Sequence, residues 1–137
     1  SEIIGVESEQ THELSPGFNL LMKVDLLTRD GEGTTTLTDF KTSAKKMNGD
    51  AASHGQMTTY SLLYPTAKLR FLVFLKTKKG GIEETYTERS GMQRQQIVRD
   101  FLEFRKEAES PDNQFVRVPS WACKGCPYQT HCEGGYK

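Results

Sequence analysis

Hydrophobic residues are concentrated in two runs near the start of the chain, at residues 2–7 and 18–28, which are rich in β-branched or apolar residues and end in polar ones. These runs predict β-strands, and residues 34–40, with three threonines followed by alternation of apolar and polar positions, predict a third. Residues 30–33 read Asp-Gly-Glu-Gly, a sequence typical of a tight turn between two strands. We therefore expect residues 18–28 and 34–40 to form a hairpin.

The second half of the chain changes from strand to helix periodicity. Residues 68–76 form the most hydrophobic run and predict a central strand buried on both faces. A Lys-Lys-Gly-Gly turn then leads to a further strand at residues 82–88. Apolar residues at helical spacing predict helices at residues 50–64, where Pro65 follows, and at residues 90–109. The expected apolar positions are Met57, Tyr60, Leu63 and Tyr64 in the first helix and Met92, Ile97, Phe101, Leu102 and Phe104 in the second.

The order of these elements is β-β-β-α-β-β-α, without internal repeats. It predicts an α/β or α+β domain with a mixed central β-sheet flanked by helices. We expect this core to span residues 1–118, with an irregular stretch at residues 110–121. A small cysteine module at residues 119–137 completes the predicted organisation.

Composition excludes several classes of protein. The chain has 137 residues, one domain's worth, and a formal net charge of zero, so it is no polybasic nucleic-acid tail. No apolar run approaches the roughly 18 residues of a membrane span, so no transmembrane helix is expected, and no signal peptide is visible in the sequence. Three clustered cysteines are typical of metal or cluster ligands in an intracellular protein, so we expect a cytoplasmic or nucleoid location.

The strand that ends in Asp39-Phe40-Lys41 carries the strongest candidate chemistry. Side chains alternate along a strand, so Asp39 and Lys41 are expected on one face and Phe40 on the opposite face, in the core. The carboxylate can hold a hard divalent cation. The lysine can orient a water molecule or stabilise charge on a phosphate.

A second carboxylate, Asp25, lies on the preceding strand. A hairpin centred on residues 31–33 places Asp25 near Asp39, and adjacent carboxylates repel unless a cation lies between them. This pairing predicts an Mg²⁺ or Mn²⁺ site, for which Glu7 at the end of the first strand is a candidate third carboxylate. The alternative is that Asp25, Asp39 and Lys41 form a surface cluster of salt bridges.

Three ordered motifs resemble the PD-(D/E)XK nucleases of the RecB type. They are Val-Asp at residues 24–25, Thr-Asp-Phe-Lys-Thr at residues 38–42 and Gln-Met-Thr-Thr-Tyr at residues 56–60. The family pattern is an Asp, then DYKT, then QxxxY on the following helix. The resemblance implies a restriction-endonuclease-like core and hydrolysis of phosphodiester bonds in DNA.

The same resemblance assigns roles to individual residues. Asp25, Asp39 and the main-chain carbonyl of Phe40 would bind the metal, and Lys41 would act on the nucleophilic water. Gln56 and Tyr60 would position the lysine loop and the DNA backbone, although a Tyr four residues after a Gln is also typical of a packed helix face. His12 and His54 are interpreted as ordinary surface histidines.

The cysteines have the spacing C-x2-C-x5-C, which suits zinc or an iron–sulfur cluster. After such a core, the spacing resembles AddB-type and CRISPR-associated RecB-like exonucleases, in which a fourth cysteine upstream completes a 4Fe-4S cluster. No upstream cysteine is present, and the chain starts at Ser1. We therefore expect a fragment that lacks an N-terminal helix, with His131 or a water molecule as the alternative fourth ligand. The cluster residues would be Cys123, Cys126 and Cys132, and buried cysteine packing is the remaining alternative.

The predicted function is therefore a metal-dependent deoxyribonuclease, in particular an exonuclease of recombination, repair or phage- and CRISPR-related DNA processing. Its partner would be DNA, as single strands or duplex ends, together with a helicase or recombination protein, and no membrane. Two alternatives remain: a nuclease-like domain that binds DNA without cutting it, and a cysteine-cluster interaction module. Candidate phosphate contacts, which a solvated surface would explain equally well, are Lys45, Lys46, Lys76, Lys78 and Lys79.

Overall fold

The computed structural model of the protein describes residues 1–47, 50–112 and 120–132. The chain divides into two compact units, Ser1–Glu103 and Phe104–Lys137. The first unit contains the sheet and the candidate nuclease residues, and the second contains the cysteines. Each unit is described by itself below.

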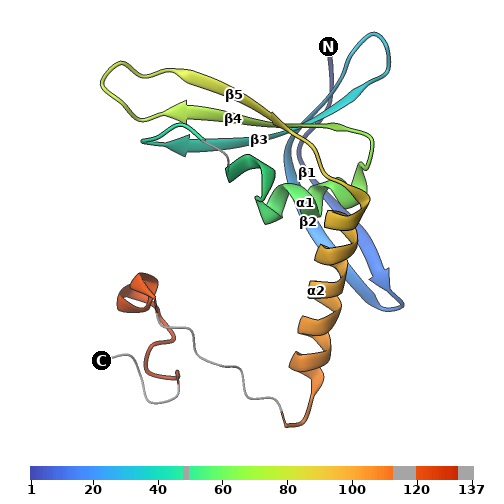
Figure 1. The fold of residues 1–137 in the computed structure, drawn as a ribbon, viewed down its shortest axis with the longest axis vertical. Helices are drawn as coiled ribbons and strands as arrows, with labels where there is room; N and C mark the ends of the chain where they lie inside the picture. The colour runs from blue at the N-terminus through green and yellow to red at the C-terminus, as the bar shows by residue number, and fades with distance from the viewer. Residues whose placement is uncertain (48–49, 113–119, 133–137) are drawn as a thin grey trace. The chain divides into compact units, whose positions relative to one another are not determined.

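The first unit is built on a five-stranded mixed sheet in the order β1-β2-β3-β4-β5 (Figure 1). β3 and β4 run parallel, whereas the other neighbouring strands are antiparallel. This α/β arrangement with two helices is the predicted one. The strands are β1 (Glu2–Ser15), β2 (Phe18–Arg29), β3 (Thr35–Ser43), β4 (Lys68–Leu75) and β5 (Ile82–Thr87), and the helices are α1 (Gly55–Leu63) and α2 (Gly91–Glu109), with short 3-10 turns η1 (Asp50–Ala52) and η2 (Trp121–Gly125).

The predicted hairpin joins β2 to β3 through the turn at residues 30–33. The Asp30 carboxylate accepts hydrogen bonds from the main-chain N–H groups of Glu32 and Thr34, which close the turn. Gly33 has φ of 86°, a conformation that side chains disfavour. The turn fixes a register in which Leu26 pairs with Thr38, so Asp25 and Asp39 lie one step further along the two strands.

The parallel pairing of β3 with β4 brings the carboxyl ends of both strands to one edge of the sheet. The register runs from Thr36 opposite Lys68 to Ser43 opposite Leu75. Beyond the strands, the N–H of Lys76 donates to the carbonyl of Ser43 at 2.8 Å. The connection between the two strands contains η1 and α1, and α1 packs on the sheet through Met57 and Tyr60.

The core lies on the face of the sheet that α1 covers, and within the described residues of the first unit the opposite face is open. Phe40 is 41% exposed and Phe74 39% exposed, and their rings meet edge to face on that open side. The predictions that Phe40 enters the core and that β4 is buried on both faces are therefore wrong. The placement of Asp39 and Phe40 on opposite faces of β3 was predicted correctly, but Asp39 faces the covered side and Phe40 the open one. The buried core comprises Met22, Val24, Leu27, Leu37, Ala51, Met57, Tyr60, Leu69, Phe71 and Val73.

Two element boundaries differ from the prediction. β1 extends to Ser15 because it pairs with β2 along almost its whole length. The helix predicted at residues 50–64 is divided into η1 and α1, because His54 has an extended backbone with ψ of 113°. The expected irregular stretch at residues 110–121 lies partly outside the described residues.

Helix α2 was predicted correctly, and it begins with a reciprocal cap. The N–H of Gln93 donates to Ser90 Oγ, and the N–H of Ser90 donates to Gln93 Oε1. None of its residues is buried, and Met92 and Phe104 of its predicted apolar face are exposed. Among the described residues, no helix combines the length and the apolar character needed to cross a bilayer.

A matched pair of phenylalanines on β4 tests which face forms the core. Phe71 is fully buried, so Phe71→Ala should lower the free energy of unfolding by about 3–5 kcal/mol. Phe74→Ala, on the open face, should lower it by less than about 1 kcal/mol. Urea denaturation measures both values, and Phe71→Leu serves if the alanine variant does not fold. Equal losses at the two positions would contradict this description of the sheet.

Candidate active site

The site begins with an ion pair on β3. Asp39 and Lys41 project from the same face of the strand, and Lys41 Nζ lies 2.9 Å from Asp39 Oδ2. The Asp39 residue is 2% exposed, because it faces the covered side of the sheet. The predicted sharing of one face by these two side chains is confirmed.

Asp25 reaches the same strand from β2. Its Oδ2 accepts a hydrogen bond of 2.8 Å from the main-chain N–H of Phe40, the residue between Asp39 and Lys41. This bond fixes the Asp25 carboxylate against the end of the β2–β3 ladder. The hairpin therefore brings the two aspartates together, as the sequence predicted.

The electrostatics of Asp39 favour a bound cation. Burial raises the pKa of Asp39, the Lys41 ammonium lowers it, and the charge of Asp25 raises it again. Asp39 Oδ2 is buried, and in the described part of the chain its polar contact is the ion pair with Lys41. A buried carboxylate with spare lone pairs beside a second carboxylate fits a hard divalent cation.

Helix α1 contributes a chain of hydrogen bonds that ends at the lysine. Lys41 Nζ donates to Gln56 Oε1 at 2.7 Å, and Gln56 Nε2 donates to the Tyr60 hydroxyl at 2.9 Å. The Tyr60 hydroxyl donates in turn to the carbonyl of Lys23 on β2 at 2.7 Å. Burial also raises the pKa of Tyr60. Gln56, supported by Tyr60, therefore gives Lys41 a second partner besides Asp39.

Glu7 lies near the aspartates but is engaged elsewhere. It falls between the pairs Val6–Leu26 and Ser8–Val24, which puts it across from Asp25, and its φ of 46° marks an irregular position in β1. Its carboxylate lies 3.8 Å from Lys23 Nζ. A pocket of about 550 Å³ is lined by Glu7, Leu21, Met22, Lys23, Asp25, Gln56, Thr59 and Tyr60.

The described ranges contain no group of three His, Cys, Asp or Glu side chains gathered closely enough to hold a metal. At the carboxylate site this leaves two aspartates and the main chain of Phe40 as the available oxygen ligands. A third ligand from Glu7 stays a prediction. Metal or cluster binding by the cysteines also stays a prediction, because Cys123, Cys126 and Cys132 are half-buried free thiols. The spacing is present, but neither an iron–sulfur cluster nor zinc is supported by the geometry of this segment.

The two histidines differ from each other. His12 is half-buried on β1, opposite Leu20. His54, expected on the surface, packs its ring edge-on against Phe71 with centroids 5.2 Å apart. Its positive form would lower the pKa of Asp39, so it lies near the carboxylate site.

The five candidate phosphate-binding lysines are exposed. Two of them follow the end of β3 and three follow the end of β4, the two strands whose carboxyl ends lie side by side. The main-chain bond from Lys76 to Ser43 ties the two segments together. These lysines, Lys45, Lys46, Lys76, Lys78 and Lys79, therefore follow the same edge of the sheet at which Asp39 and Lys41 lie.

One residue near this site was not predicted. Arg89 follows β5. Its buried guanidinium donates hydrogen bonds to residues just before α1 and in the first turn of α1. Its acceptors in that segment are the Thr58 hydroxyl and the carbonyls of Ala51 and His54, which lie 31 to 38 residues away along the chain. Because main-chain carbonyls are common to every sequence, no pattern could have indicated this contact.

Comparisons with known proteins agree with this geometry. The family model of the PD-(D/E)XK nuclease superfamily matches residues 1–133. The solved structure titled "Crystal structure of SSO0001" is similar to this chain, with a TM-score of 0.62 and 19% sequence identity. The match covers 97% of this chain but 62% of that one, and at this identity it shows the fold alone. A comparison with curated proteins gave no match.

The raised pKa of Asp39 predicts the effect of removing its charge. A carboxyl whose pKa is raised on folding stabilises the protein below its ordinary pKa of 3.8, and this stabilisation is lost as the pH rises through the folded-state pKa. In EDTA at neutral pH, Asp39→Asn should therefore have a higher melting temperature than the parent.

The difference should shrink as the pH falls toward 3.8, where the parent carboxyl is also neutral. Asp112→Asn, at an exposed carboxylate, is the matched control and should leave the melting temperature equal to that of the parent at neutral pH and near pH 3.8. Thermal melts across this pH range measure the effect. A lower melting temperature for Asp39→Asn at neutral pH would show that the Lys41 ion pair outweighs burial.

Proposed function

Because the chain belongs to the PD-(D/E)XK nuclease superfamily, we propose that it is a metal-dependent deoxyribonuclease acting through the Asp25, Asp39 and Lys41 site. The observation that carries this proposal is the position of Lys41. Its ammonium is held between the Asp39 carboxylate at 2.9 Å and Gln56 Oε1 at 2.7 Å. A surface salt bridge would leave the lysine mobile and the carboxylate solvated.

Nucleases of this superfamily typically use divalent metals. Asp25, Asp39 and the main-chain carbonyl of Phe40 are the residues that would hold Mg²⁺ or Mn²⁺ here. When bound, such an ion would polarise the scissile phosphate and lower the pKa of a coordinated water. The fit rests on the buried Asp39 oxygen, whose polar contact is with Lys41, and on the adjacent Asp25.

The protein's own groups would carry the remaining work. The Lys41 ammonium would stabilise the attacking hydroxide or the charge that develops on the phosphate. Gln56 would keep Nζ of Lys41 pointed at the reacting phosphate. Tyr60 would fix Gln56 through its hydroxyl, which also donates to the carbonyl of Lys23. We further propose that the enzyme degrades DNA from ends or as single strands, by analogy with the RecB-type motifs.

Removal of the lysine or the buried aspartate should abolish cutting. The measurement is cleavage of labelled single- and double-stranded DNA with Mg²⁺, Mn²⁺ or EDTA. Lys41→Ala should lower the rate by about 100- to 1000-fold, as expected for the loss of a charge that stabilises the transition state. Asp39→Ala should be at least as severe.

Lys68→Ala, an exposed lysine at the opposite end of β4, is the control and should cut normally. A linear substrate and a closed circle of the same sequence separate end-dependent from internal cleavage. Metal-dependent cutting that survives in Lys41→Ala would contradict the assignment. DNA binding without any cutting by the parent would favour a non-cleaving nuclease-like domain instead.

The lysines at the ends of β3 and β4 should bind the DNA backbone without reading sequence. Removing one lysine–phosphate interaction should reduce the slope of log K against log salt by roughly 0.9 for duplex and 0.7 for single strands. Replacing Lys45, Lys46, Lys78 and Lys79 by alanine should therefore weaken binding and flatten the slope, equally for unrelated sequences. Fluorescence anisotropy at several salt concentrations measures this. An unchanged slope would assign these lysines to the solvated surface.

A further inference from the structure

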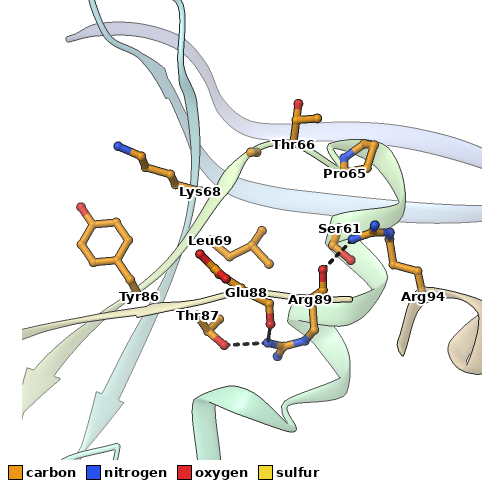
Figure 2. A pocket seen from close by; sticks show the side chains of 11 residues that line it. Ser61, Pro65, Thr66, Lys68, Leu69, Tyr86, Thr87, Glu88, Arg89 and Arg94 are labelled. Atoms are coloured by element: carbon orange, nitrogen blue, oxygen red, sulfur yellow. Dashed lines mark hydrogen bonds between the residues drawn. The ribbon is translucent and has the colours of Figure 1, made fainter. Parts of the chain in front are cut away.

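The guanidinium of Arg89 is buried, with 8% of the residue exposed, and it has no acid partner in the described part of the chain. Its five N–H groups each donate to a neutral oxygen at 2.6 to 3.0 Å. Figure 2 shows the bonds to Thr87 and Glu88, beside a pocket of about 510 Å³. The five acceptors are Thr58 Oγ1, Thr87 Oγ1 and the carbonyls of Ala51, His54 and Glu88.

These acceptors lie on two separate parts of the fold. Ala51, His54 and Thr58 belong to the segment that leads into α1 and forms its first turn, whereas Thr87 is the last residue of β5 and Glu88 follows it. The guanidinium therefore ties the start of α1 to the edge strand of the sheet. The first turns of α2 support this connection, because Arg94 donates to the carbonyl of Arg89 (Figure 2) and Gln93 Nε2 donates to the carbonyl of Ala52.

Stability alone explains this arrangement poorly. Burial without a counter-ion disfavours the charged form, and it lowers the pKa of Arg89. Buried ionic groups often contribute less to the stability of the fold than apolar side chains of similar volume would. What a guanidinium provides is a rigid planar fan of five donors, which fixes the relative positions of the groups it contacts.

The part of α1 that Arg89 fixes is the part that holds Lys41. His54 is the N-cap of α1, and its side chain makes no capping hydrogen bond. Gln56 follows two residues later in the first turn, and its Oε1 accepts the bond from Lys41. A helix start without a side-chain cap frays readily, so the external donors of Arg89 determine where Gln56 lies.

We propose that Arg89 is a positioning residue of the nuclease site, which anchors the first turn of α1 so that Gln56 holds Lys41 beside Asp39. This inference rests on the proposed nuclease function. Arg89 itself acts through Gln56 and touches neither DNA nor metal. Arg89→Lys keeps the charge but cannot reproduce the planar fan of donors, so it is the sharpest substitution.

The kinetic test is a double-mutant cycle with Gln56→Ala. Arg89→Lys and Gln56→Ala should each lower kcat by about 10- to 100-fold, as for other groups that orient a catalytic residue, with KM little changed. The double variant should be no slower than the slower single variant, because both remove the same support of Lys41. Leu69→Val, a core truncation at the start of β4, is the control. Its fold reduction in kcat should multiply with that of Gln56→Ala in the double variant. If the fold reductions in kcat of Arg89→Lys and Gln56→Ala multiply in the double variant, the proposal is overturned.

A second measurement does not depend on cleavage. In the parent, the Lys41 ammonium should give a hydrogen-bonded ¹H–¹⁵N signal, which Lys41→Arg identifies by its absence. Arg89→Lys and Gln56→Ala should both move this signal to the position of exposed lysines, and Leu69→Val should leave it in place. An unmoved signal in Arg89→Lys would overturn the proposal. A moved signal in a chain that does not cut DNA would leave the positioning role standing and reject the nuclease function.

Circular dichroism shows whether Arg89→Lys is folded. If it is not, Thr58→Val takes its place, because it removes the acceptor of Arg89 Nε while keeping the side-chain shape. The same coupling to Gln56→Ala and the same movement of the Lys41 signal are then expected, at smaller size. Their absence in a folded Thr58→Val would equally overturn the proposal.

Discussion

The buried carboxylate of Asp39 lies between one cation, Lys41, and one like charge, Asp25. Burial and the second aspartate both disfavour its ionised form, and the single ammonium does not offset them fully. The carboxylate therefore gains from any further positive charge that reaches its free lone pairs. This imbalance supports the proposal that the site takes up a divalent cation, whereas a fully compensated ion pair would favour a purely structural contact.

The topology of the sheet explains how so small a chain assembles this site. An antiparallel hairpin with a tight turn brings Asp25 to β3. A parallel partner for β3 needs a crossover, and the crossover is the segment that contains α1. Gln56 and Tyr60 are therefore carried to Lys41 by the same connection that the parallel pairing requires. The lysines that follow β3 and β4 reach the same edge for the same reason.

The sequence was sufficient for features that depend on local periodicity and turn chemistry. The Asp-Gly-Glu-Gly turn determined the register, and the register determined that Asp25 approaches Asp39. It was not sufficient for the side of the sheet that is covered, because alternation separates Phe40 from Asp39 without saying which of them faces α1. Arg89 was missed because its partners are mostly main-chain carbonyls, and the break before α1 was missed because it depends on His54 being extended.

The aspartates and the lysine of the site are consequently held in place by different parts of the fold. The aspartates are fixed by the β2–β3 hairpin, through the turn at residues 30–33 and the bond from the Phe40 N–H to Asp25. Lys41 depends in addition on α1, whose start has no side-chain cap and is held from β5 by Arg89. Under the proposed function, changes on the hairpin should therefore alter metal affinity first, whereas changes around the start of α1 should alter the cleavage rate at constant metal affinity. A site divided in this way can lose its lysine geometry while it keeps its carboxylate pair.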